Sequence, residues 1–251
     1  MKTSFLLLPL LVAGLLISGC SNLVKTFGNG KTIIPSNIII SEPRPVNNFT
    51  GVDMRTLGKV SISQGDSESL NIKGSDNIVP LIKTTVQNGV LVIEMVENHH
   101  ITELNNENLL TITIMVKDLS ALTLSGASLV EMDSLSTSKL AITMSGAGQA
   151  RMDHLTADTL SITLSGLGDV EIAGEATQAT FNISGAGNIN APELKIQNAD
   201  ITVPGLGAAT VWVTGQLTGE ISGGGTVSYY GNPQTSTKTS GLGTFKSLGT
   251  K

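Results

Sequence analysis

The sequence predicts an all-β fold: a single-stranded parallel β-helix, right-handed, with about 18 to 20 residues per coil. A recurring turn signature, a strand-like alternation around it and a column of glycines predict this fold. The signature is a Ser-Gly or Pro-Gly pair that begins at Ser125, Ser145, Ser165, Ser184, Pro204, Ser222 and Ser240. Neighbouring signatures are 20, 20, 19, 20, 18 and 18 residues apart, which is typical of stacked copies of one unit.

The residues around each signature alternate between apolar and polar with the period of a β-strand. Ile142, Thr143 and Met144, just before the second signature, show the pattern. Each repeat is expected to hold two short strands on either side of a turn. One repeat buries too little apolar surface to offset its chain entropy, so the repeats must stack. Equivalent residues such as Leu124, Met144 and Leu164 should then lie directly above one another.

The turns are predicted to be structural. Glycine adopts left-handed or crowded backbone positions that other residues avoid. A strand follows each turn, whereas a phosphate-binding loop needs a helix there. The predicted turn residues are Ser125, Gly126, Ser145, Gly146, Gly148, Ser165, Gly166, Gly168, Ser184, Gly185, Gly187, Gly205, Gly207 and Gly223.

Residues 1–19 read as a lipoprotein signal peptide. Lys2 precedes an apolar run over residues 5–17 that is too short to span a bilayer comfortably. The following Ile-Ser-Gly-Cys resembles the bacterial lipobox, which implies cleavage before Cys20 and lipid attachment to its thiol. Cys20 is the single cysteine of the chain, so no intramolecular disulfide can form. Ser21 implies the outer membrane by the enteric sorting pattern. The alternatives are an ordinary secretory signal or an N-terminal membrane helix.

The remaining chain divides into three parts. Residues 20–48, with several glycines and prolines, form a tether. Residues 49–245 form one domain, in which 49–119 give irregular coils that cap one end and 120–245 give the regular repeats. Residues 246–251 are expected to be a frayed tail. The strands predicted in the capping part are residues 59–63, 70–73, 80–86, 90–96 and 110–116, with a hairpin turn at Asn88-Gly89.

Four segments in order, residues 48–52, 60–66, 70–72 and 88–93, precede the glycine repeats. Together they resemble the auto-transporter adhesin, head GIN domain family of bacterial secreted proteins and lipoproteins, over residues 45–245. The resemblance implies a β-helical domain with an adhesin-like role and supplies no catalytic motif. Ser128, in place of a turn glycine, and Pro204, in place of serine, depart from the repeat and suggest local irregularity.

Two groups of side chains raise the question of metal binding or catalysis. His99 and His100 could bind a metal with nearby carboxylates, but adjacent residues of a strand point to opposite faces, which favours a solvated loop. Asp133, Asp153, Asp169 and Glu171 could serve a polysaccharide lyase or a carboxylate-pair hydrolase, as some β-helices do. Solvated corners are the favoured interpretation, because later coils place Ala173 and Pro192 at the equivalent position and no Lys or Arg cluster accompanies the carboxylates. Fold likeness alone does not establish an activity. We therefore predict no catalytic residue, no metal, no cofactor and no enzyme activity.

Aromatic residues late in the repeats have two interpretations. Trp212, Tyr229 and Tyr230 could form a platform on which sugars stack, or they could fill the core and the end of the solenoid. The second interpretation is favoured because Tyr229 falls in an apolar column.

These observations predict a lipid-anchored protein of the bacterial cell envelope, held in the outer membrane through Cys20. Its side faces, rich in Thr, Ser and Asn, would bind a polysaccharide or a surface protein without catalysis. The formal net charge is −5 and no basic run is present, so nucleic acid is not an expected partner. Two alternatives are a structural envelope component without a soluble ligand and a polysaccharide-active enzyme.

Overall fold

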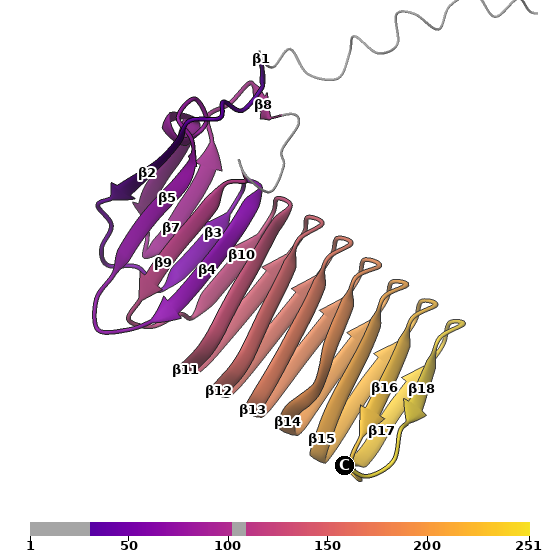
Figure 1. The fold of residues 1–251 in the computed structure, drawn as a ribbon. Coiled ribbons are helices and arrows are strands. Elements are labelled where there is room, and N and C mark those ends of the chain that lie inside the picture. Colours follow the sequence, from indigo (N-terminus) through magenta and orange to yellow (C-terminus); the bar gives the residue numbers. More distant parts are fainter. Residues whose placement is uncertain (1–30, 102–108) are drawn as a thin grey trace, which may run out of the picture.

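The computed structural model describes residues 31–101 and 109–251 (Figure 1). They form a straight solenoid of stacked parallel strands with a cap of additional strands at its N-terminal end. None of the helices in this described part has the length and apolar character needed to cross a membrane. The predicted all-β solenoid is confirmed.

The regular coils follow the predicted period. Each strand pairs in parallel with its equivalent in the next coil, as Ala121 does with Ala141 and Leu217 with Thr235. The paired residues are 17 to 20 positions apart. The strands are β10 (Ala121–Leu124), β11 (Ser128–Met144), β12 (Gln149–Leu164), β13 (Asp169–Ile183), β14 (Asn188–Val203), β15 (Ala208–Ile221), β16 (Thr226–Tyr230), β17 (Gln234–Thr239) and β18 (Thr244–Ser247).

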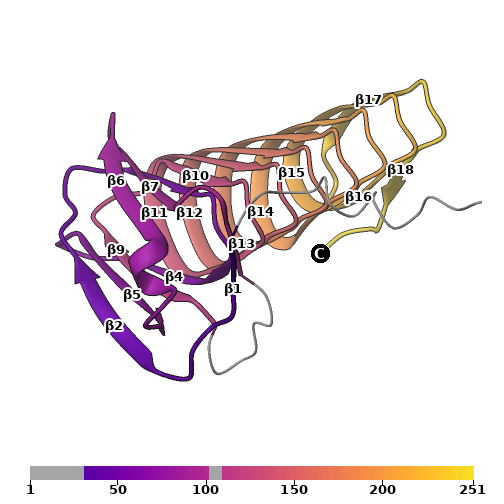
Figure 2. The same cartoon turned by 90° about the horizontal axis from the view of Figure 1, so that it is seen from above.

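Each full coil has three sides, one more than the sequence predicted. The long strand of a coil bends twice. At the second bend two successive polar residues face outward in β11 to β14, whereas the first bend varies and holds Ala173 and Gly174 in β13. In β12 the bends lie at Asp153 with His154 and at Asp158 with Thr159, which separate sides 149–152, 155–157 and 160–164. Figure 2, seen from above, shows the coils stacked around one continuous interior. The short middle side was not predicted from the sequence, because it adds only one or two inward residues to each coil.

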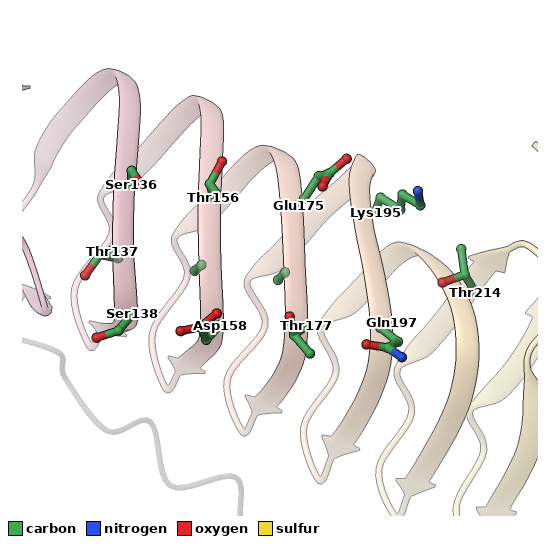
Figure 3. Close-up of a pocket in the computed structure, with 12 residues that line it drawn as sticks. Ser136, Thr137, Ser138, Thr156, Asp158, Glu175, Thr177, Lys195, Gln197 and Thr214 are labelled. Carbon is green, nitrogen blue, oxygen red and sulfur yellow. The ribbon is translucent and has the colours of Figure 1, made fainter.

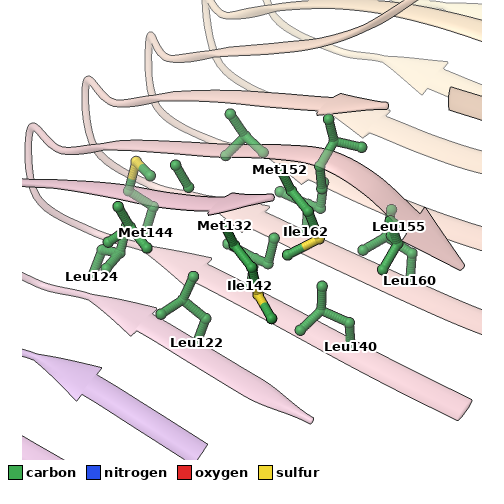
Figure 4. Close-up of a cluster of buried hydrophobic side chains, with 14 of the residues drawn as sticks. Leu122, Leu124, Met132, Leu140, Ile142, Met144, Met152, Leu155, Leu160 and Ile162 are labelled. Carbon is green, nitrogen blue, oxygen red and sulfur yellow. The ribbon is translucent and has the colours of Figure 1, made fainter. Parts of the chain in front are cut away.

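The apolar columns fill the interior as predicted. Leu124 pairs with Met144 and Met144 with Leu164, and all three are fully buried. Figure 4 shows these columns packed between the sides of the coils. A gap of about 10 Å³ near Met132 and Met152 is at the lower limit for one water molecule. A ligand of any size must therefore bind on the outside of the solenoid.

The N-terminal coils are stacked out of sequence order. Strands β3 (Gly51–Met54) and β4 (Gly58–Gln64) lie directly beside β10 and β11. Strands β7 (Val90–Met95) and β9 (Thr111–Val116), which come later in the chain, pair with the other edges of β3 and β4. The chain thus builds one coil, places a second coil outside it, and returns to start the regular repeats.

Antiparallel strands cover the outer end of this arrangement. Strand β5 (Ser69–Ser75) pairs with β9, and β2 (Ile39–Arg44) pairs with β5. After a one-turn 3-10 helix, η2 (Val79–Leu81), strand β6 (Ile82–Gln87) pairs with β7. Strand β1 (Lys31–Ile33) pairs with β8 (His99–Ile101). Strands β1 and β2 lie within the segment that the sequence suggested as a tether, so its second half packs on the domain.

The C-terminal end carries no such cover. In its last coil, Thr235, Thr237 and Thr239 occupy the inward positions and are exposed. Phe245 packs its half-buried ring against Gly219 and closes part of the interior. Strand β18 extends to Ser247, two residues beyond the boundary that the sequence suggested.

Candidate binding groove on the side of the solenoid

A shallow open groove of about 750 Å³ runs along the middle side of the coils, from β11 to β15. Figure 3 shows two rows of outward side chains along it. One row holds Ser136, Thr156, Glu175 and Lys195, and the other holds Ser138, Asp158, Thr177 and Gln197. The groove crosses about four coil intervals of about 4.8 Å, so it suits an extended ligand.

Two alanines lie in the floor of the groove. Between the two rows, Ala157 and Ala176 point toward the interior and are buried. An alanine fills little of the core, so the backbone of these two coils can lie closer to the solenoid axis. In the next two coils the same column holds the larger Ile196 and Val213, which are fully buried. Small inward residues therefore explain the hollow only at β12 and β13.

The groove offers hydrogen-bonding groups without a catalytic arrangement. Its twelve lining residues supply hydroxyl groups, two carboxylates from Asp158 and Glu175, the ammonium group of Lys195 and the amide of Gln197. They include no histidine, cysteine or aromatic residue. An activated nucleophile is hydrogen-bonded to a base, and in the described part of the chain no hydroxyl group of the groove is hydrogen-bonded to Asp158 or Glu175. The groove can bind a polar polymer through hydrogen bonds.

A column of alternating charges lies on the neighbouring side. Glu131, Arg151 and Glu171 are paired in register in successive coils. Arg151 Nη1 lies 3.7 Å from Glu171 Oε2, and Lys59 Nζ lies 2.9 Å from Glu131 Oε2. These pairs are exposed, so they contribute little to the free energy of unfolding.

The predicted carboxylates are mostly engaged in local contacts. Arg151 Nε donates to Asp153 Oδ1 at 2.9 Å, and this hydrogen bond with the charge of Asp153 raises the pKa of Arg151. Asp169 Oδ1 accepts from Asn188 Nδ2 at 2.8 Å. Asp133 is exposed and shares a hollow of about 250 Å³ with Arg151 and Asp153.

The predicted histidine pair lies on β8. His99 Nδ1 is 2.9 Å from the carbonyl oxygen of Glu97, and His100 is the next residue of the strand, so the two rings point to opposite faces. Glu103, a carboxylate near them in sequence, lies outside the described residues. Within residues 31–101 and 109–251, no three His, Cys, Asp or Glu side chains gather as a metal site requires.

The late aromatic residues contact the chain's own C-terminus. Trp212 and Tyr230 are register partners, and Lys251 Nζ lies 5.3 and 5.5 Å from their ring centroids. Lys251 also forms an ion pair with Glu193. Tyr229 packs partly against the core. Because a lysine already occupies the two outward rings, a structural role is favoured over a sugar platform.

Close stacking explains the glycine turns. A Cβ atom on Gly146 would lie 2.1 Å from the carbonyl oxygen of Gly126, and one on Gly166 would lie 2.0 Å from that of Gly146. None of the turn glycines has a positive φ. Crowding by the coil below, and not a left-handed conformation, therefore requires glycine here. The other predicted turn residues, Ser125, Ser145, Gly148, Ser165, Gly168, Ser184, Gly185, Gly187, Gly205, Gly207 and Gly223, occupy the same stacked turns.

The two departures from the repeat have local explanations. Ser128 is buried, and its hydroxyl donates to the carbonyl oxygen of Thr56 at 2.7 Å. Its register partner is Gly58, the first residue of β4 in the cap. Pro204 has no N–H group, and the N–H of Gly205 donates to the carbonyl oxygen of Ile183 at 3.1 Å instead. Both substitutions keep the coil geometry.

The groove was not predicted, although two adjacent polar residues recur along one of its edges in four coils: Ser138-Lys139, Asp158-Thr159, Thr177-Gln178 and Gln197-Asn198. Cys20, the predicted lipidation site, lies outside the described residues.

Comparison with known proteins identifies a family and solved structures that are similar to this chain. A family model described as "Putative auto-transporter adhesin, head GIN domain" matches residues 48–233. A search of curated proteins finds no match. Among solved structures, a putative adhesin from Bacteroides fragilis has 29% identity and a TM-score of 0.82, covering 86% of this chain and 100% of that one.

Two solved structures at lower identity share the fold. A putative lipid binding protein from Parabacteroides distasonis has 19% identity and a TM-score of 0.72, covering 87% of this chain and 100% of that one. A putative adhesin from Parabacteroides merdae has 20% identity and a TM-score of 0.64, covering 86% and 99%. The match of the family model over most of the chain identifies it: the protein belongs to the head GIN domain family of auto-transporter adhesins.

Proposed function

We propose that this protein is a non-catalytic, adhesin-like binding protein of the bacterial cell envelope, anchored by lipid on Cys20, and that its groove binds an extended polysaccharide. The groove carries this proposal. It is long, open and lined by hydroxyl, amide and carboxylate groups that match the hydroxyl groups of a sugar chain. The adhesin family supports a role at the bacterial cell surface.

The coil spacing favours a polymer over a small molecule. A polar side chain recurs in each row at each coil, about every 4.8 Å, so an extended ligand can form hydrogen bonds along its length. An open groove buries little of a small ligand, whereas a polymer can contact several coils at once. Many anchored copies on one cell would add avidity to weak individual sites.

Binding to a glycan array tests the groove. Thr156→Arg places a long charged side chain in the groove, and Thr143→Arg places the same side chain on another outer side of the solenoid. Both threonines are exposed. We expect at least a tenfold loss of affinity for the bound glycan with Thr156→Arg and no loss with Thr143→Arg. Failure of the unchanged protein to bind any envelope or host glycan would contradict the proposal, as would equal losses in both variants.

The anchor is tested separately. Cells that express the protein are fed labelled palmitate, and the purified chain is examined for the label. We expect label in the unchanged chain and none in Cys20→Ser. Cell fractionation then shows whether the labelled chain lies in the outer membrane. An unlabelled chain would overturn the anchor and leave the groove proposal standing.

A further inference from the structure

A short apolar segment lies on the outer end of the cap. Ile34 and Ile38, between β1 and β2, are 62% and 64% exposed, and Ile39 at the start of β2 is 39% exposed. Among the described residues, β2 pairs only with β5, so it is the outermost strand of the cap (Figure 1). We call Ile34, Ile38 and Ile39 the cap patch.

The backbone of the cap patch is held in place by the rest of the cap. Asn77 Nδ2 donates to the carbonyl oxygen of Ile34 at 2.9 Å, and the N–H of Asp76 donates to the carbonyl oxygen of Ile38 at 2.9 Å. Pro35, which follows Ile34, is buried. Because adjacent residues bind the two isoleucines, these lie close together. The fold thus presents apolar side chains to the outside in a fixed position.

The charge of the chain is divided at this segment. Residues 20–41 hold Lys25 and Lys31 and no acidic residue. Residues 42–251 hold all 20 acidic residues of the chain and 12 of its 15 basic residues, a net formal charge of −8. An anionic bilayer surface therefore attracts the first part and repels the second.

The acidic side chains nearest to the cap patch are engaged. The carboxylate of Asp76 accepts a hydrogen bond from the hydroxyl of Ser36. Glu42 Oε1 forms an ion pair with Arg44 Nε at 3.2 Å. Neither leaves an isolated negative charge beside the isoleucines.

The route of the chain brings the cap patch close to the proposed anchor. Lys31, the first residue of β1, follows Cys20 by eleven positions. Even a fully extended chain of that length spans at most about 40 Å. The patch begins three residues further on, at Ile34. A bilayer that holds a lipid on Cys20 is therefore an apolar surface within reach of the patch.

We propose that the cap patch rests on the bilayer that holds the lipid of Cys20, with Ile34 and Ile38 in the headgroup region. The acidic solenoid then points away from the bilayer, with its C-terminal end outermost and its groove extending outward. Apolar side chains in the interface and basic residues beside them together hold a protein on an anionic membrane surface. This proposal rests on the lipid anchor proposed above.

The turns offer the alternative orientation. Leu167, Leu206 and Leu242 are 70%, 73% and 97% exposed along one edge of the solenoid. A solenoid that lies flat on this edge would press these leucines against the bilayer. Its acidic body would then lie along the anionic surface, within the Debye length of about 10 Å over which charges repel. The charge of the chain therefore favours contact through the cap.

Lipid quenching distinguishes the two orientations. Ile38→Cys and Leu242→Cys are prepared separately, and a small fluorophore is attached to the new thiol. The full lipidated chain is reconstituted into phosphatidylethanolamine–phosphatidylglycerol vesicles that contain a phospholipid with a nitroxide on its headgroup. We expect quenching at position 38 to be at least threefold stronger than at position 242. Equal or stronger quenching at position 242 overturns the proposal.

Matched substitutions test the contact itself. Ile34→Asp in the Ile38→Cys chain should reduce quenching at position 38 at least twofold, because it places a negative charge on the cap patch. Leu206→Asp places the same charge on a similarly exposed turn residue and should leave that quenching unchanged. Equal effects of the two substitutions would contradict the contact.

The palmitate label separates a failure of the anchor from a failure of the orientation. The parent chain, which has Cys20 as its single cysteine, reports any free thiol at that position. A chain without the label removes the anchor and this proposal together. A labelled chain without quenching at position 38 removes only this proposal.

Discussion

The two ends of the solenoid are finished in different ways. At the N-terminal end, antiparallel strands cover the outer coil, and Phe49 is buried to 1% exposure. At the C-terminal end, the last coil simply replaces inward leucine and isoleucine with threonines and leaves Phe245 half-buried. A stack of coils can thus be closed by added structure or by a change of inward residues. The first solution should contribute much more to the free energy of unfolding.

The two phenylalanines give the largest expected difference. Phe49→Ala should lower the free energy of unfolding by about 3–5 kcal/mol, because it leaves a cavity in a closed part of the core. Phe245→Ala should lower it by only about 1–2 kcal/mol, since its ring is already partly exposed. Denaturant unfolding of each variant measures both values. Equal losses would show that the open end is as tightly packed as the capped one.

Turn glycines at the two ends provide a second comparison. A Cβ atom at Gly126 would lie 2.2 Å from the carbonyl oxygen of Thr56, and one at Gly241 would lie 2.1 Å from that of Gly223. Gly126 is also held by the next coil, but no coil lies beyond Gly241. Gly126→Ala should therefore cost about 2–3 kcal/mol, whereas Gly241→Ala should cost under about 1 kcal/mol because its turn can move outward. The midpoints of thermal unfolding rank the two variants, and the reverse order would contradict this explanation.

The smallest expected effect concerns pH and the capped end. Glu68 accepts hydrogen bonds from the backbone N–H groups of Asn48 at 2.9 Å and Phe49 at 3.1 Å, which lower its pKa below the ordinary value of 4.5. A lowered pKa in the folded state stabilises the protein above the ordinary value, and this contribution is lost as the pH falls through the folded-state pKa. In Glu68→Gln, the free energy of unfolding should therefore fall less steeply than in the unchanged protein as the pH decreases below about 4.5. An unchanged acid profile would show that the carboxylate does not hold the start of the domain.

The regular coils were predictable because their information is local and repeated. The spacing of the turns sets the register, so the stacking of Leu124, Met144 and Leu164 followed directly. The strands of the cap were also recognisable, including the hairpin at Asn88 and Gly89, whose φ angles of 51° and 77° suit its tight turn. Apart from the two strands of this hairpin, the partners of the cap strands were not predictable. Alternation marks a strand but does not say which distant strand lies beside it.

The groove and the turn glycines likewise depend on spatial arrangements that the sequence does not reveal. The hollow over Ala157 and Ala176 depends on where the strand bends, which two adjacent polar residues indicate only in retrospect. Glycine at the turns could reflect a left-handed backbone or close stacking, and both are equally visible in a sequence. Distances between coils decide for stacking. A glycine in the sequence predicts that a position is constrained. The contact with the neighbouring coil determines whether crowding or backbone conformation is the cause.

The out-of-order stacking of the first coils affects how the chain folds as it is synthesised. Val52 pairs with Leu91 on one side and with Leu122 on the other. The earliest strands therefore cannot complete their pairing until residues well downstream have left the ribosome and, in an exported protein, the translocation channel. Contacts so distant in sequence form slowly. Every later coil, in contrast, grows on a template that already exists, so the segment synthesised first is the one whose assembly sets the pace.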